Sequence, residues 1–366
     1  MRKQVSLGIA MLALVVSACT EAADTTTTAD SGGTETTAQA GTGTGGLLAE
    51  VQARGNLICG VNDVVPGFGF ADADGNFSGF DVDFCRAVAA AVLGDPEAVE
   101  YTPLTAQTRF TALQAGEVDV LIRNTTFTAA RDGTEAGTFA TTTFYDGQGM
   151  MVRSDSGFSS VDDMADTSVC VLSGTTTELN LATRFAGITY TPLTFEDNEQ
   201  LQAAFIAGQC DGWTSDKSQL AAVKSNWPAD DGGPDSLVIL DETFSKEPLG
   251  PVVLDGDQEW AEVVDWTVKV IILAEELGID AATAASYDGD NADIRRLLGL
   301  PTGEDQTVFD PGLGLSTDFA QQVIAAVGNY GEIYDRHLGP DTLINIPRGL
   351  NALYTDGGIL YAHPYR

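Results

Sequence analysis

Strand and helix patterns alternate along this chain, and the alternation starts a second time before the first unit is complete. Segment 118–122 has the character of a buried strand, and segment 84–93 places Phe84, Val88 and Val92 at helical spacing. Alternation of this kind predicts a largely parallel sheet flanked by helices. The pattern restarts after Met151, and Pro251 begins a return to the first unit. The sequence therefore predicts an α/β protein of two units, with the second inserted into the first.

The predicted boundaries follow from this nesting. Lobe 1 is expected over 47–152 and 249–366, and lobe 2 over 153–248. Strands are predicted at 57–62, 118–122, 168–172, 210–213 and 237–240, with another starting at 189. Helices are predicted at 47–53, 84–93, 110–115, 177–185, 199–207, 260–277, 292–298 and 318–327. Two crossings between lobes make a hinge, and small ligands bind in clefts at the carboxyl ends of parallel strands.

The first 46 residues differ from the rest in composition. Arg2 and Lys3 precede an apolar run from 5 to 16, which is followed by Ser17, Ala18 and Cys19. This order is typical of an export signal, and the run is too short for a membrane span. Segment 16–19 resembles the lipobox of bacterial lipoproteins, which implies cleavage before Cys19 and its lipidation. A plain secretory signal with a chance cysteine is the alternative.

Residues 20–46 are rich in Thr, Gly and Ala and offer almost nothing to bury, so we expect a disordered tether. The sequence thus predicts an exported protein held by a lipid anchor on the periplasmic or extracellular face of a membrane.

The charge of the chain excludes some partners. The 366 residues contain 18 Lys and Arg against 53 Asp and Glu, a formal net charge of −35. Binding to nucleic acid is not expected, because phosphate contacts need a basic face. Such acidity otherwise indicates a well-solvated surface and does not identify a ligand. With only two His and no Cys-x-x-Cys spacing, neither a metal site nor a cofactor is expected.

Four cysteines remain if Cys19 carries lipid. An even number in an exported protein predicts disulfides. Cys59 and Cys85 fall in lobe 1, and Cys170 and Cys210 fall in lobe 2, so pairing within each lobe leaves the hinge free. We predict the bridges Cys59–Cys85 and Cys170–Cys210, with four buried free thiols as the alternative.

Several stretches resemble one family. Segments 78–83 and 110–119, together with Arg131, resemble the polar amino-acid-binding proteins of ABC importers, the bacterial extracellular solute-binding proteins of family 3. The general L-amino-acid-binding branch is indicated by segments 123–126, 145–149, 173–181, 245–251, 327–334 and 347–353. The resemblance covers nearly everything from Leu47 onward. Familiar members of the branch are soluble periplasmic proteins, whereas this chain carries a lipobox.

The resemblance implies a two-lobed, type II periplasmic-binding-protein-like fold with a hinge of two crossover segments. It also implies a monomer that captures free L-amino acids, broadly among polar and acidic ones, and delivers them to an inner-membrane ABC permease. An exported enzyme like cyclohexadienyl dehydratase is the alternative on the same fold. No Gly-x-Ser-x-Gly, P-loop or cluster of His favours an enzyme.

The α-groups of an amino acid need two charged partners in a dehydrated cleft. A carboxylate is best met by a bidentate Arg, and Arg131 matches the family's carboxylate-binding residue. Its alternative role is that of a surface Arg at a helix start. Asp216 matches the ammonium-binding Asp, with a helix N-cap as its alternative. Thr176 and Thr177 open a helix whose N-terminus suits the carboxylate, and Thr175 with Glu178 has capping-box spacing.

Further contacts are implied by the family match. Asn124 and Thr126 match positions that hold the α-groups, with turn formation as the alternative. Asn62, Asp63 and Phe68 match side-chain-recognition positions, although Phe68 is equally expected in the core. Arg123 is a further candidate for side-chain recognition. Ala106 stands where narrower relatives place a stacking aromatic residue, which predicts a roomier pocket and broader specificity.

Overall fold

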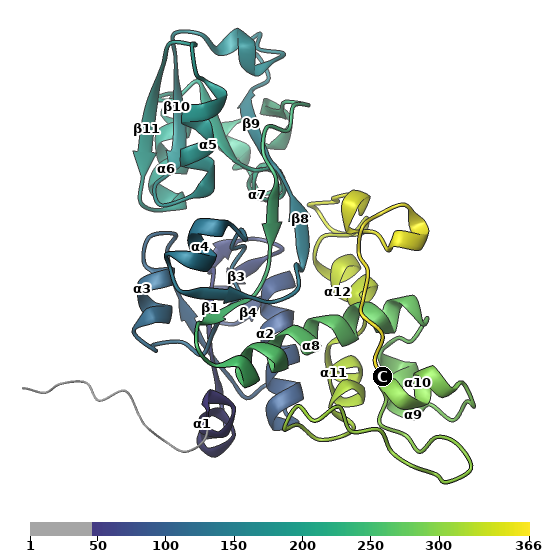
Figure 1. Ribbon diagram of the computed structural model, residues 1–366. Coiled ribbons are helices and arrows are strands. Elements are labelled where there is room, and N and C mark those ends of the chain that lie inside the picture. Colours follow the sequence, from purple (N-terminus) through teal and green to yellow (C-terminus); the bar gives the residue numbers. More distant parts are fainter. Residues whose placement is uncertain (1–45) are drawn as a thin grey trace, which may run out of the picture. The chain divides into compact units, whose positions relative to one another are not determined.

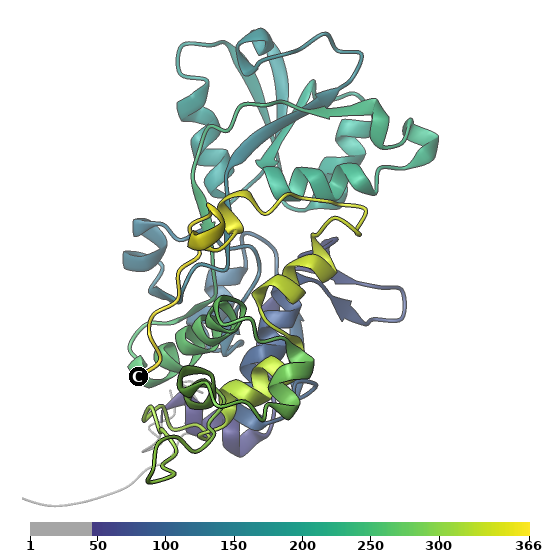
Figure 2. The ribbon, with the colours of Figure 1, turned by 90° about the vertical axis from the view of Figure 1, so that its right-hand side faces the viewer.

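The computed structural model describes residues 46–366 (Figures 1 and 2). The predicted export signal, Cys19 and the tether up to residue 45 lie outside the described residues. The described part contains two five-stranded sheets, which we call the first and second sheets. Helices alternate with their strands, which confirms the predicted α/β class.

The first sheet has the strand order β5-β1-β6-β15-β7. Its strands are β1 (Leu57–Val61), β5 (Val99–Pro103), β6 (Val120–Leu121), β7 (Gly137–Phe139) and β15 (Val252–Leu254). β1 pairs in parallel with β5 and β6, and β15 pairs antiparallel with β6 and β7. Since β15 follows the whole second sheet in the chain, the first sheet is completed by a returning segment, as the sequence predicts.

Most of the helices belong with the first sheet. They are α1 (Leu47–Arg54), α2 (Phe80–Leu93), α3 (Arg109–Gln114), α4 (Ala129–Gly133), α8 (Gln258–Glu276), α9 (Ala281–Ser286), α10 (Ala292–Leu297), α11 (Phe319–Val327) and α12 (Tyr330–His337). α8 begins two residues before its predicted start because Asp257 caps it, accepting the Trp260 N–H at 2.9 Å. The indole N–H of Trp260 donates to the Asp119 carbonyl at 2.9 Å, which fixes α8 beside β6. α2, α8 and α11 pack together to form the main hydrophobic core.

The second sheet has the order β11-β10-β12-β9-β13. Its strands are β9 (Gln148–Arg153), β10 (Thr167–Leu172), β11 (Tyr190–Phe195), β12 (Gly212–Asp216) and β13 (Leu237–Ile239), and its helices are α5 (Thr176–Arg184), α6 (Asn198–Ile206) and α7 (Lys217–Ser225). Alternate residues of β10 enter different cores: Cys170 packs in one cluster, and Val169 and Val171 pack in another. Both faces of this sheet are therefore covered. The sheet is mixed and not largely parallel as predicted, because β10 pairs in parallel with β11 and β12 whereas β9 pairs antiparallel with β12 and β13.

A short two-stranded ladder connects the sheets. β8 (Phe144–Asp146) pairs antiparallel with β14 (Glu247–Leu249), so the outgoing and returning segments lie side by side (Figure 1). β9 begins directly after Gly147 and pairs with β12 and β13. The predicted crossing between residues 152 and 153 therefore falls inside a strand of the second sheet.

The remaining elements are short. A three-stranded antiparallel sheet follows β1 and consists of β2 (Val64–Val65), β3 (Gly69–Ala71) and β4 (Phe77–Ser78). Single turns of 3-10 helix lie at Val161–Met164, Ala229–Asp231, Pro234–Ser236, Gly349–Asn351 and Tyr354–Asp356.

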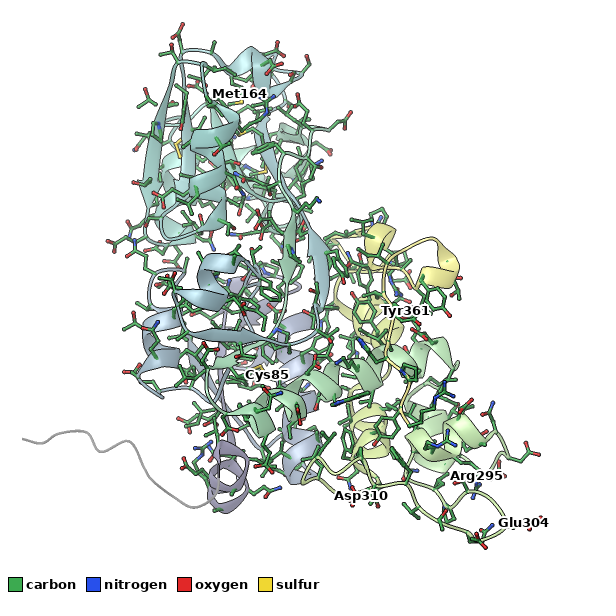
Figure 3. All side chains as sticks on the ribbon, in the orientation of Figure 1. Cys85, Met164, Arg295, Glu304, Asp310 and Tyr361 are labelled. Carbon is green, nitrogen blue, oxygen red and sulfur yellow. A yellow bond between two sulfur atoms is a disulfide. The ribbon has the colours of Figure 1, made fainter. Side chains whose placement is uncertain are left out.

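Both disulfides join elements of a single sheet and its helices. Cys59 on β1 is bonded to Cys85 on α2. Figure 3 labels Cys85. Cys170 on β10 is bonded to Cys210, which lies just before β12 and not on a strand as predicted. These are the pairs that the sequence predicts. Neither bridge ties the first sheet to the second, so neither restricts motion between them.

Replacing both Cys170 and Cys210 with Ala should lower the free energy of unfolding by about 2–4 kcal/mol, because the bridge restricts the unfolded chain. Urea unfolding of the oxidised protein and of the double variant measures the difference. The matched pair Cys59→Ala with Cys85→Ala should lose a similar amount. Unchanged stability, or a peptide map that pairs Cys59 with Cys170 or Cys210, would contradict the prediction.

Candidate ligand-binding site

The predicted binding residues come from segments that follow parallel strands. Asn124 and Thr126 follow β6, Thr176 follows β10, and Asp216 ends β12. These strand ends face one another, and a small cavity of about 30 Å³ lies between the segments. The predicted residues that line it are Asn124, Thr126, Arg131, Thr176, Thr177 and Asp216. The structure therefore brings together residues from both sheets at one place.

Arg131 is held in place by its own neighbours. It lies in α4, where Thr128 caps the helix and accepts the Arg131 N–H at 3.3 Å. Its Nη1 donates to the Thr126 carbonyl at 2.9 Å, and its guanidinium lies 5.6 Å from the centre of the Phe110 ring. Arg131 is only 7% exposed. A guanidinium has five donors, so this one is positioned by a single bond while other donors remain for a ligand.

Asp216 is a buried carboxylate whose Oδ1 has no hydrogen-bond partner among residues 46–366. It is 6% exposed, and burial raises its pKa well above the ordinary value. Repulsion from Asp146 and Glu247 raises the pKa further, while attraction to Arg131 and Arg109 lowers it. Asp216 precedes α7, but its side chain makes no capping hydrogen bond, which argues against the N-cap alternative. An unpaired buried acceptor of this kind suits a cationic ligand group.

Thr175 caps the first turn of α5, which leaves Thr176 and Thr177 free of that role. Thr175 accepts the Glu178 N–H at 3.1 Å, and the Glu178 carboxylate accepts the Gly174 N–H at 2.9 Å. The capping role predicted as an alternative for Thr175 is therefore correct. The positive end of the α5 dipole faces the cavity that Thr175, Thr176 and Thr177 line, which favours an anion there.

Glu247, which the sequence reasoning did not select, joins the two sides of this site. It lies on β14, is 1% exposed, and accepts four hydrogen bonds. Its donors are Thr126 Oγ1 at 2.7 Å, Thr176 Oγ1 at 2.7 Å, Asn180 Nδ2 at 2.8 Å and Ser245 Oγ at 2.6 Å. The hydroxyls of Thr126 and Thr176 are thus directed at Glu247. In the sequence, Glu247 was marked only by its place in segment 245–251, which resembles the family.

Two further polar residues were also missed. Arg109, at the start of α3, lines the small cavity, and its Nε has no partner among residues 46–366. Burial lowers the pKa of Arg109, with Arg131 and Arg123 adding repulsion. Gln148 on β9 donates to the Thr177 carbonyl at 2.9 Å and to Thr214 Oγ1 at 2.8 Å, so it ties α5 to β12. Gln148 stands in segment 145–149, which resembles the family, whereas Arg109 stands in no such segment.

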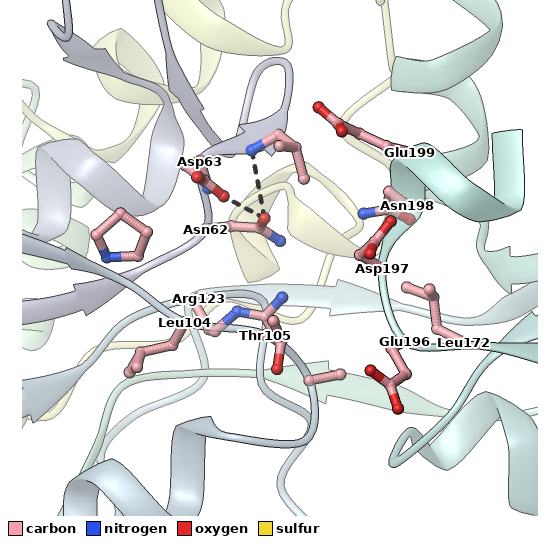
Figure 4. A pocket seen from close by; sticks show the side chains of 13 residues that line it. Asn62, Asp63, Leu104, Thr105, Arg123, Leu172, Glu196, Asp197, Asn198 and Glu199 are labelled. Atoms are coloured by element: carbon pink, nitrogen blue, oxygen red, sulfur yellow. Dashed lines mark hydrogen bonds between the residues drawn. The ribbon is translucent and has the colours of Figure 1, made fainter. Parts of the chain in front are cut away.

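A second, larger cavity of about 410 Å³ adjoins the first, and Figure 4 shows it from close by. Asn62 and Asp63 line it, as the prediction of side-chain recognition requires. Asn62 donates to Asn124 Oδ1 at 3.1 Å, which links the segments that follow β1 and β6. Ala106 lines both cavities, so no aromatic side chain stands between them at this position.

Phe68 lies in the hydrophobic core, away from both cavities. It is 1% exposed, and its ring meets those of Phe144 and Phe80 edge-on at centroid distances of 5.2 and 6.0 Å. Its carbonyl also accepts the Asp81 N–H at 3.0 Å, which ties it to the start of α2. The predicted ligand-binding role for Phe68 is corrected: the aromatic ring is more stable packed among other rings than beside a polar ligand.

Asn124 adopts a left-handed backbone conformation with φ of 35°. Its N–H donates to Asp81 Oδ2 at 2.6 Å, and Asp81 lies at the start of α2. Burial raises the pKa of Asp81 to about 7, although this hydrogen bond and the charge of Arg123 both lower it. A buried acid with a shifted pKa therefore supports the segment that lines the site.

Asp81→Asn should change how stability depends on pH. The folded pKa is about 7, whereas the unfolded chain keeps a value of about 4. The folded state thus binds this proton more tightly, and the wild type loses stability as pH rises from about 4 to about 7. Over that window the free energy of unfolding of Asp81→Asn should rise relative to the wild type.

Urea unfolding between about pH 4 and about pH 8 tests this expectation. Asp74→Asn, at an exposed aspartate of the loop before β4, is the control and should follow the wild type. A difference between Asp81→Asn and the wild type that stays constant from about pH 4 to about pH 7 would refute the expectation.

Two sheets joined by a paired crossover, with a polar cavity at the facing strand ends, define a two-lobed binding protein of the type II periplasmic-binding-protein fold. Residues 57–288 match the bacterial extracellular solute-binding proteins, family 3. The chain belongs to this family. No helix in the described residues is long and apolar enough to cross a membrane. Within the same part of the chain, no group of acids, His or Cys is arranged to hold a metal.

Individual relatives are similar over most of their length. The general L-amino acid-binding periplasmic protein AapJ of Rhizobium johnstonii is 48% identical, over 87% of this chain and 92% of its own. The glutamate/glutamine/aspartate/asparagine-binding protein BztA of Rhodobacter capsulatus is 47% identical, over 89% and 95%. A solved periplasmic binding protein from Brucella ovis, with glutathione bound, is 46% identical with a TM-score of 0.83, covering 87% of this chain and 99% of that one.

Proposed function

We propose that this protein captures free L-amino acids outside the cytoplasm and delivers them to an ABC importer. The observation that carries the proposal is that one cavity is lined both by the guanidinium of Arg131 and by the carboxylate of Asp216. Arg131 is held by the Thr126 carbonyl with donors to spare, and Asp216 Oδ1 has no partner within residues 46–366. An α-amino acid carries the two complementary charges on one carbon. The named amino-acid-binding relatives support the same ligand class.

In the proposed complex the ligand carboxylate meets Arg131 and the N-terminus of α5. Thr176 and Thr177 contribute backbone N–H groups of that first turn, which has no intrahelical acceptors for them. The ligand ammonium meets Asp216, with Asn124 and Thr126 beside it. Bringing the cation to Asp216 lowers the pKa of that carboxylate again, because an opposite charge favours the ionised form.

The ligand is proposed to bind between two lobes that move about a hinge. β8 and β14 are its two strands, and Gly147 marks the outgoing crossing in place of the boundary between residues 152 and 153. Lobe 1 then includes the first sheet and lobe 2 the second. Each disulfide stays within one lobe, so such motion strains neither bridge. No covalent step is needed, so capture and release account for the function.

We expect the site to bind several different amino acids. Ala106 places a small side chain between the two cavities where narrower relatives carry an aromatic one, and Asn62 and Asp63 stand at the larger cavity. We infer that glutamate, glutamine, aspartate and asparagine bind with affinities within about two decades of one another, or under about 3 kcal/mol.

Arg131→Ala should abolish binding of every amino acid, because it leaves the shared α-carboxylate unpaired at a cost of about 3–5 kcal/mol. That cost is two to three decades or more in affinity. A thermal-shift panel of the twenty amino acids, followed by calorimetry on those that stabilise, measures it. Arg296→Ala, at a partly exposed Arg of α10 paired with Asp293, is the control.

Retained affinity in Arg131→Ala with an unchanged melting temperature would show that another residue holds the carboxylate. Stabilisation of the wild type by a single amino acid would contradict the proposed breadth and leave the binding function in place. Turnover of prephenate or arogenate by the purified protein would instead favour the dehydratase alternative.

We also propose that Cys19 carries lipid and anchors the protein to a membrane. The support is the order of basic, apolar and small residues that ends at Cys19, since the relatives bear on a periplasmic function but not on an anchor. Cys19→Ala should therefore move the protein from the membrane fraction to the soluble fraction of cells that produce it. Fractionation with an antibody against the folded part measures this. An identical distribution of wild type and variant would contradict the anchor.

A further inference from the structure

Arg123 is a buried guanidinium that the proposed α-group site does not use. It follows β6, is 5% exposed, and lines both the small and the large cavity. Its Nε has no hydrogen-bond partner among residues 46–366, and its guanidinium forms no ion pair there. Figure 4 shows its side chain extending into the middle of the larger cavity. A buried donor without a partner is costly, so an acceptor on the ligand would stabilise it.

The lining of the larger cavity is asymmetric in charge. Among the described residues that line it, Arg123 is the sole base, whereas the acids are Asp63, Glu196, Asp197 and Glu199. Arg123 lies where the two cavities meet, and the acids Glu196 to Glu199 come from the segment that opens α6. The side chain of a ligand whose α-groups occupy the small cavity would therefore contact Arg123 first, and the acids of the larger cavity only beyond it.

A structural role for Arg123 is the competing explanation. Its charge is attracted to Asp81, but Asp81 Oδ2 accepts the Asn124 N–H, and no ion pair links Asp81 to Arg123. Asp81 therefore compensates part of the buried charge without occupying the donors of the guanidinium. Arg123 lines both cavities, so a bound ligand can reach its guanidinium.

We propose that Arg123 binds the oxygen at the end of the ligand side chain and makes the site prefer amino acids with a side-chain carboxylate or carboxamide. This inference rests on the proposed function. Arg131 and Asp216 hold the α-groups that all amino acids share, and Arg123 distinguishes among them by a group that only some carry. A site built to pair a polar group discriminates against ligands that leave its own group unpaired.

Calorimetry with glutamate, glutamine and alanine on Arg123→Met tests the inference. Met keeps the length and apolar stem of Arg and removes its donors. We expect glutamate and glutamine to bind about 10- to 100-fold more weakly, and alanine to keep its affinity within about 3-fold. The double variant Asp81→Asn with Arg123→Met removes the buried acid as well, so it preserves the charge balance and should show the same selective loss.

The outcomes separate this inference from the function on which it rests. An equal loss for all three amino acids, or no loss for glutamate and glutamine, would overturn the inference and leave the binding function intact. Failure of both variants to fold would make Arg123 a structural residue and would also overturn it. If the wild type bound none of the three amino acids, the proposed function would fall, and this inference with it.

Discussion

The site depends on one buried carboxylate, Glu247. A carboxylate that loses water costs several kcal/mol unless its lone pairs are satisfied. Here four neutral donors satisfy it, and they come from the segment after β6, from α5, and from Ser245 beside β14. Because these donors belong to different parts of the chain, their shared acceptor holds the facing edges of the cavity together.

The position of Glu247 also connects the site to the crossover. Glu247 pairs with Asp146 in the ladder of β8 and β14. The carboxylate of Asp146 accepts a hydrogen bond from the Ser218 hydroxyl at the start of α7. Burial raises the pKa of Asp146 to about 6, and the charge of Glu247 contributes to the rise. The ladder that joins the sheets is therefore lined with acids whose charges interact, and Asp216 belongs to the same group. A cation that arrived at Asp216 would relieve this repulsion.

Local patterns predicted the long helices well but missed several strands, including β5 and the six-residue β9. α8 and α11 were found within two residues because many residues at helical spacing face the core. β8 and β14 were missed as strands because each has three residues and its partner lies far along the chain. Phe68 was selected because it matches a side-chain-recognition position of the family, with a place in the core as an equal alternative. The rings of Phe80 and Phe144, which decide between these roles, come from other elements.

The sequence by itself predicted the nested α/β organisation and the cysteine pairs, and it selected Arg131 and Asp216, which line one cavity. Each of these follows from the order of residues along the chain, or from a stretch that resembles a known family. The tertiary structure decided that Glu247 accepts hydrogen bonds from both Thr126 and Thr176, and that Gln148 ties α5 to β12. It also placed Arg109 and Arg123 at the cavity, each with an Nε that has no partner in the described part of the chain. The reason is physical: a hydrogen bond depends on which distant groups folding brings within about 3 Å, and no local pattern records that distance.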